Sequence, residues 1–108
     1  MWGEIRMLLE LLRTRKKEYD VTIFQTPIFR QKKGYQQVYR LQIEGISHSD
    51  CLDEVFSRFN ITDRIPTDFE GRFVGTGDIC FIDEGRKGQY YYQLKPGGWV
   101  EVNRIHVC

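Results

Sequence analysis

The sequence predicts a small single domain of the α+β class, with a mostly antiparallel sheet and one packed helix. Three short apolar or aromatic runs between residues 79 and 102 are separated by glycine-bearing turns, as in successive antiparallel strands. A single apolar stripe at helical spacing precedes them. A length of 108 residues suffices for one hydrophobic core. We therefore expect a folded domain over residues 19–108, preceded by an N-terminal extension over residues 1–18.

The extension has the pattern of an amphipathic helix. Its apolar residues recur at spacings of three and four, and they are Trp2, Ile5, Leu9 and Leu12. Cations follow at residues 13–17, where they suit the carboxyl end of the helix dipole. A basic amphipathic helix fits either the anionic inner face of a membrane or the groove of a partner protein. Packing of the helix onto the domain's own sheet is the competing interpretation.

Two strands open the domain. The first is expected at residues 19–26 (YDVTIFQT) and ends at Pro27, because proline has no N–H group to donate to a ladder. The second is expected at residues 35–44 and is broken by Gly45. Residues 28–34, between the two strands, form a polar and basic connector.

The clearest helix signal covers residues 48–59. Ser47, with Asp50 three residues later, resembles a capping box at the start of the helix. Asn60 is expected to end the helix as a left-handed C-cap. The stripe that should face the core follows the i, i+3, i+4, i+7 pattern and consists of Leu52, Val55, Phe56 and Phe59.

Three further strands complete the predicted fold. They are expected at residues 79–82, 89–94 and 99–102, with connectors at residues 84–88 and 95–98. Asp78 follows Gly77 and is expected to organise a turn, and the segment 83–85, from Asp83 to Gly85, is expected to form the end of a hairpin. Alternation along the second of these strands places Tyr91 on the face opposite Tyr90 and Tyr92. At least one aromatic ring should therefore point away from the core.

Composition excludes several classes of protein. The net charge is +1, which gives no bulk electrostatic argument for binding nucleic acid. The three cysteines are too widely spaced for a disulfide framework and fit free thiols in a reducing cytosol. No apolar run approaches the roughly 18 residues that a membrane span requires. We therefore expect a cytoplasmic protein.

The histidines and cysteines do not form a ligand pattern. His48-x-x-Cys51, Cys80 and His106-x-Cys108 lack the paired close ligands of structural zinc sites. A catalytic Cys–His pair needs a third group that orients the histidine, and no local signature supplies one. We therefore expect no metal, no cofactor, no small-molecule substrate and no enzymatic activity.

The candidate interaction residues are cations in the connectors and one outward-facing aromatic ring. They are Arg30, Lys32, Lys33, Arg86, Lys87 and Tyr91. Such a surface fits a protein partner, since tyrosine and arginine concentrate at interface hot spots. The main alternative is a single-stranded nucleic-acid-binding or regulatory module that stacks bases on Tyr91 or Trp99, with help from the cations Arg30, Lys32 and Lys33. Packing of these aromatic rings within a small sheet is the structural explanation that competes with both.

Three segments resemble the YodL-like family of small proteins of spore-forming bacilli. They are YDVTIFQTP, YRLQIEG…HSDCLDEVFSRFN and GDICFIDEG…YYYQLKPGGWVEV, and the resemblance spans about residues 19–107. It implies a sporulation-associated factor without enzymatic activity. Such a factor alters rod shape by acting on the actin-like cytoskeletal protein MreB, and so on cell-wall elongation. The resemblance supplies neither catalytic residues nor a binding motif.

Overall fold

Five strands form a single sheet in the computed structural model, which describes residues 16–107. The strands are β1 (Lys17–Gln25), β2 (Gln36–Gly45), β3 (Ile79–Asp83), β4 (Gln89–Lys95) and β5 (Gly98–Val102). Their order is β2-β1-β3-β4-β5, and each neighbouring pair is antiparallel. The predicted α+β class and all five predicted strands are confirmed. The predicted N-terminal helix, with Trp2, Ile5, Leu9 and Leu12, lies outside the described residues.

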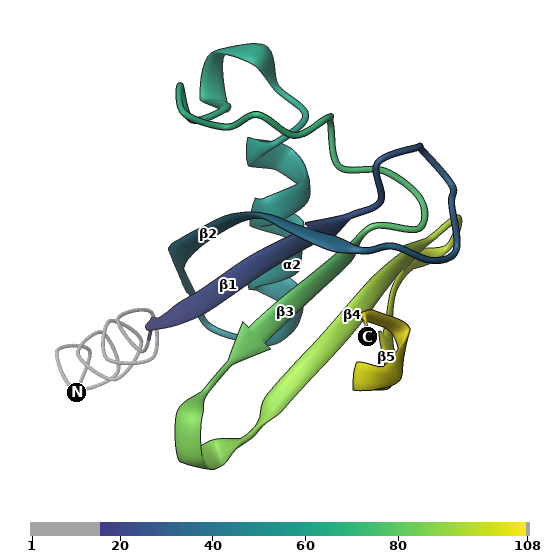
Figure 1. Ribbon diagram of the computed structural model, residues 1–108. Coiled ribbons are helices and arrows are strands. Elements are labelled where there is room, and N and C mark those ends of the chain that lie inside the picture. The colour runs from purple at the N-terminus through teal and green to yellow at the C-terminus, as the bar shows by residue number, and fades with distance from the viewer. Residues whose placement is uncertain (1–15, 108) are drawn as a thin grey trace, which may run out of the picture.

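Helix α2 (His48–Arg58) packs across one face of this sheet (Figure 1). The predicted cap is present, because the Asp50 N–H donates to Ser47 Oγ at 3.1 Å. The Asp50 carboxylate accepts from the Ile46 N–H at 3.0 Å and so satisfies a second backbone donor. Between helix and sheet lies the core, which includes Val21, Ile23, Ile43, Cys51, Leu52, Val55, Phe59, Cys80 and Ile82.

Two helix predictions are wrong. Phe56 is 45% exposed, whereas Leu52, Val55 and Phe59 on the same stripe are 3% exposed or less. Asn60 is not left-handed, since the helix unwinds through a tighter turn in which the Asn60 N–H donates to the Ser57 carbonyl. The Asn60 side chain instead donates to the Val74 carbonyl at 3.1 Å, which ties the end of the helix to the approach to β3.

A buried ion pair fixes the long connection between α2 and β3. Asp78 is 2% exposed and accepts from Arg72 Nη1 at 3.1 Å, from Gln25 Nε2 at 3.0 Å and from the Gly75 N–H at 2.9 Å. Arg72 Nη2 in turn donates to the Thr26 carbonyl at 2.7 Å. The predicted turn role of Asp78 is confirmed. The network also joins this connection to the point where β1 ends.

The two faces of the sheet differ. On the face covered by α2, the rings of Tyr90 and Tyr92 contact His48. On the opposite face, Tyr91 stacks on Phe81 with ring centres 4.5 Å apart. The prediction that one of the three tyrosines points away from the core is therefore confirmed. Among residues 16–107, no helix is both long and apolar enough to cross a membrane.

Candidate functional site

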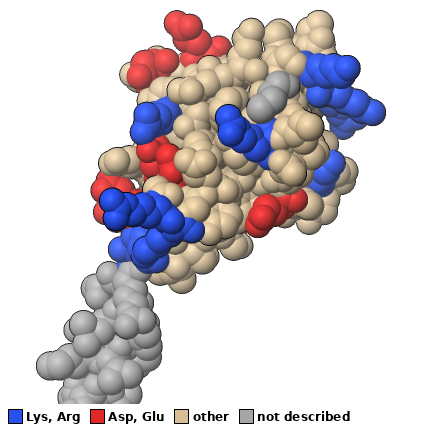
Figure 2. Space-filling view, turned by 60° about the horizontal axis from the view of Figure 1, so that its bottom comes forward, with Lys and Arg blue, Asp and Glu red and all other residues tan. Residues whose placement is uncertain are grey.

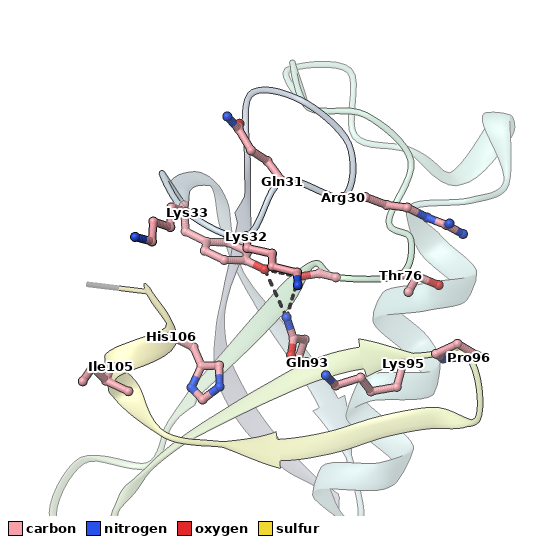
Figure 3. Close-up of a pocket in the computed structure, with 12 residues that line it drawn as sticks. Arg30, Gln31, Lys32, Lys33, Thr76, Gln93, Lys95, Pro96, Ile105 and His106 are labelled. Carbon is pink, nitrogen blue, oxygen red and sulfur yellow. Dashed lines mark hydrogen bonds between the residues drawn. The ribbon is translucent and has the colours of Figure 1, made fainter.

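A basic pocket of about 860 Å³ lies at one end of the sheet (Figure 3). Figure 1 shows that the β1–β2 loop, the segment before β3 and the β4–β5 turn gather at this end. Figure 3 shows Gln93 at the centre, between the β1–β2 loop and the short 3₁₀ turn η3 (Arg104–Val107). Four cations and one histidine line the pocket, and they are Arg30, Lys32, Lys33, Lys95 and His106.

Local hydrogen bonds shape the β1–β2 loop. The Thr26 hydroxyl donates to the Ile28 carbonyl at 2.6 Å, and the Gln31 N–H donates to the same carbonyl at 3.1 Å. Arg30 has a φ of 67°, a left-handed conformation that a non-glycine residue rarely adopts. This tight turn presents successive side chains outward, as Figure 3 shows for Gln31 and Lys33.

The floor of the basic pocket is held by three hydrogen bonds. Tyr35 Oη donates to the Gly77 carbonyl at 2.5 Å, and Gln93 Nε2 donates to Tyr35 Oη at 3.1 Å and to the Gly77 carbonyl at 3.2 Å. The Gly77 N–H also donates to the Leu94 carbonyl at 2.8 Å. The end of the loop, the approach to β3 and strand β4 are thus fastened to one another beneath the cations.

The electrostatics of the basic pocket favour an anion. Arg30, Lys32, Lys33 and Lys95 are all exposed, and among residues 16–107 no aspartate or glutamate lines the pocket. Within residues 16–107, none of these four cations forms an ion pair. Arginine and lysine bind carboxylate or phosphate oxygens through charge-assisted hydrogen bonds. The pocket is therefore suited to a carboxylate-bearing or phosphate-bearing group.

The cations that were predicted as interaction residues lie in two separate groups. Arg30, Lys32 and Lys33 lie together in the basic pocket. Arg86 and Lys87 belong to the 3₁₀ turn η2 (Gly85–Lys87), at the opposite end of β4. Since a strand rises about 3.3 Å per residue, the length of β4 puts roughly 20 Å between the two groups. Figure 1 shows the β3–β4 connection at the far end of the sheet from the β1–β2 loop.

Tyr91 lies in neither group. It lines a separate hollow of about 200 Å³ on the face opposite α2, together with Phe81, Asp20 and Asp83. The two carboxylates give this hollow a different electrostatic character from that of the basic pocket. Trp99, the other ring proposed for base stacking, lines a third hollow next to the basic pocket.

Lys95, Gln93 and His106 belong to the basic pocket but were not predicted as site residues. Their positions depend on the strand order, because β3 and β4 bring the end of the chain next to the β1–β2 loop. Alternation from Tyr91 does predict that Gln93 and Lys95 share its face of the sheet. No pattern in the sequence connects them with residues 28–34.

The two described cysteines are neutral thiols. Cys51 and Cys80 are both 0% exposed. Burial is the main cause that raises the pKa of the Cys51 thiol to about 12, and it raises the pKa of Cys80 well above its ordinary value. This is the opposite of the low pKa that makes a cysteine a nucleophile. Cys108 lies outside the described residues.

His48 is held on the face covered by α2, away from any cluster of metal ligands. Its Nδ1 lies 2.6 Å from Tyr92 Oη, and its Nε2 lies 3.2 Å from the Glu84 carboxylate. His106, the other histidine, lies in the basic pocket instead. Across residues 16–107, no group of three or more histidine, cysteine, aspartate or glutamate side chains is arranged to hold a metal ion.

Positive charge does not cover a continuous face of the surface shown in Figure 2. Lysine and arginine side chains occur there in several separate groups, with aspartates and glutamates between them. An extended phosphate backbone requires a basic stripe that follows its length. The face shown in Figure 2 carries no such stripe.

Comparison with known proteins assigns the family. Residues 13–103 match the profile described as the YodL-like domain. The chain belongs to the YodL-like family. It is also 52% identical over 101 residues to the uncharacterized protein YodL of Bacillus subtilis (strain 168). The aligned region covers 94% of this chain and 97% of that protein. No solved structure matches the chain. The family predicted from the sequence motifs is confirmed.

The similarity to this YodL-like relative extends beyond the sheet and α2. Because 94% of the chain is aligned, the alignment includes part of residues 1–18, the predicted N-terminal extension. The YodL-like profile itself begins at residue 13. The profile ends at residue 103. It therefore includes all four cations of the basic pocket, three in the β1–β2 loop and the fourth at Lys95.

Proposed function

We propose that this YodL-like protein is a non-catalytic, sporulation-associated module that binds the actin-like protein MreB and so modulates cell shape and cell-wall elongation. The choice of MreB rests on the family resemblance. The choice of a binding function rests on the basic pocket, where four exposed cations surround a hydrogen-bonded floor. A fixed floor with exposed cations on its rim is suited to recognise an acidic surface on another macromolecule.

The basic pocket is the observation that carries this proposal. Its cations come from two separate elements, the β1–β2 loop and the end of β4. Electrostatic complementarity of this kind speeds encounter and fixes the orientation of the partner. Buried neutral thiols at Cys51 and Cys80 fit a structural role in the core.

The proposal places the protein in the cytoplasm, at the inner face of the membrane on which MreB filaments lie. The predicted amphipathic helix with Trp2, Ile5, Leu9 and Leu12 would bring the domain to this surface. Anionic lipid attracts basic segments such as residues 13–17. Membrane contact is thus a second part of the proposal, and it is tested separately from the pocket.

Expression in a rod-shaped bacterial host tests the function. Wild type is expected to change cell width. The double variant Lys32→Glu with Lys33→Glu, in the basic pocket, should leave cell width at its normal value. A matched double variant, Arg86→Glu with Lys87→Glu, makes the same change of charge at the far end of β4 and should act as wild type does. Equal effects of all three proteins would reject the basic pocket as the site of action.

Binding of single-stranded nucleic acid is the weaker candidate. A base stacked on Tyr91 would lie beside the Asp83 carboxylate and the Asp20–Arg40 ion pair, which give no net positive charge for a phosphate. Trp99 lines the hollow next to the basic pocket, so stacking on Trp99 is the form of this candidate that the geometry favours. Retention of the protein on single-stranded DNA or RNA, weakening steeply as salt rises, would favour this candidate.

A further inference from the structure

An apolar hollow of about 720 Å³ adjoins the basic pocket. Three aromatic rings line it, from the β1–β2 loop, from α2 and from β5: Phe29, Phe56 and Trp99. The side chains of Val74 and Leu94 add aliphatic surface, and Asp53 and Asn60 are polar residues of the same lining. Apolar surface that is shared by three elements and open to solvent is typical of a binding site. We call this surface the aromatic hollow.

The exposure of Phe56 sets the aromatic hollow apart from the core. Phe56 follows the same helical stripe as Leu52, Val55 and Phe59, which are all buried, yet 45% of its surface is accessible. Phe29 is 47% exposed. Two large rings left open on one hollow offer the kind of aromatic surface that dominates binding energy at protein interfaces.

The aromatic hollow and the basic pocket are continuous. Thr76, Lys95 and Pro96 line both of them. Neighbouring residues of the β1–β2 loop also join the two: Arg30 lines the basic pocket and Phe29 lines the hollow. The guanidinium carbon of Arg30 lies 5.4 Å from the centre of the Phe29 ring. A ligand that spans the shared border would therefore meet cations on one side and aromatic rings on the other.

We propose that the basic pocket and the aromatic hollow form one groove, which binds an acidic protein segment carrying a bulky apolar side chain beside its carboxylates. The carboxylates pair with Arg30, Lys32, Lys33 and Lys95 in the basic pocket, which no carboxylate of the described residues lines. Asp53 lines the aromatic hollow and disfavours a carboxylate there, which leaves the hollow to the apolar side chain. The apolar side chain enters the hollow against Phe56 and Phe29. This inference rests on the proposed function and specifies the chemistry of the partner's contact segment.

Selection from a phage-displayed library of random peptides on the immobilised full-length protein tests the groove. Enriched peptides should place aspartate or glutamate next to leucine, phenylalanine or tryptophan. A synthetic peptide of the enriched sequence should then bind about tenfold more weakly to Phe56→Ser, as expected for loss of an interface hot spot. Phe73→Ser is the matched control, because Phe73 is 56% exposed and lines neither cavity. Phe29→Ser provides a second, independent variant on the hollow.

The outcomes separate this inference from the proposed function. Acidic peptides without apolar preference, or equal binding by Phe56→Ser, Phe29→Ser and wild type, would overturn the groove and leave an acidic partner for the basic pocket. Selection without any acidic preference would overturn both. Displacement of the peptide by single-stranded oligouridylate, with the same loss in Phe56→Ser, would assign the groove to nucleic acid and overturn the inference. Weaker peptide binding in the Phe56 and Phe29 variants alone would support it.

Discussion

Replacing Asp78 with asparagine should cost far more stability than the same change at an exposed ion pair. The side chain of Asp78 is 3% exposed and that of Arg72 is 28% exposed, and Nη1 lies 3.1 Å from Oδ1. The Asp78 carboxylate also accepts from Gln25 Nε2 and from the Gly75 N–H. In asparagine, one carboxylate oxygen is replaced by an NH₂ group, which cannot accept a hydrogen bond from Arg72, Gln25 or the Gly75 N–H. The Arg72 guanidinium would also lose its counter-charge.

The expected loss follows from these contacts. Breaking a buried ion pair by removing one partner costs about 3–5 kcal/mol. Because water reaches part of Arg72, we expect the lower end, about 3 kcal/mol, from a total that for small domains is about 5–15 kcal/mol. With an m-value of about 1–3 kcal/mol per molar urea, the unfolding midpoint should fall by about 1–3 M.

Urea denaturation followed by circular dichroism measures this loss. The matched control is Asp20→Asn, whose partner Arg40 is 64% exposed at a separation of 2.5 Å. An exposed pair contributes about 0–1 kcal/mol, so at the same m-value this midpoint should fall by about a third or less of the shift for Asp78→Asn. Equal losses for Asp78→Asn and Asp20→Asn would refute the reasoning that the buried pair fixes the connection before β3.

Two further predictions concern the thiols and the N-terminal segment. Stability should fall as pH rises from about 9 toward about 12, by about 1.4 kcal/mol per pH unit for Cys51, because the unfolded thiol loses its proton near 9.0 and the buried one near 12. Cys51→Ala should flatten this slope in urea titrations at several pH values, and an unchanged slope would contradict the assignment. Wild type should float with anionic liposomes, and a Leu9→Glu, Leu12→Glu variant should stay in solution. Equal partitioning would reject membrane contact by residues 1–18.

Local patterns predicted the elements of the fold. Glycine-bearing turns marked the strands of the C-terminal half, and the Ser47–Asp50 spacing marked the start of α2. Asp78 was correctly assigned to a turn, because aspartate after glycine commonly accepts nearby backbone N–H groups. Its ion pair with Arg72 was not predicted, since a charge six residues away in an irregular segment has no periodic signature.

The candidate site depended on tertiary structure. Residues 28–34 were singled out for their charge, but their meeting with Lys95 follows from the placement of β3 between β1 and β4. Phe56 was predicted as a core residue because it follows the helical periodicity of the apolar stripe. Periodicity does not tell how much of that stripe the sheet covers. In the structure, the sheet covers Leu52, Val55 and Phe59, while Phe56 faces the open hollow beside Trp99.

Titration of purified MreB against the purified protein tests the central proposal most directly. Biolayer interferometry at low and moderate salt should show binding by wild type that weakens as salt rises, because the contacts are charged. Lys32→Glu with Lys33→Glu should bind at least about tenfold more weakly, and Arg86→Glu with Lys87→Glu should bind as wild type does. Absence of binding by wild type, or equal affinity for all three proteins, would contradict recognition of MreB through the basic pocket.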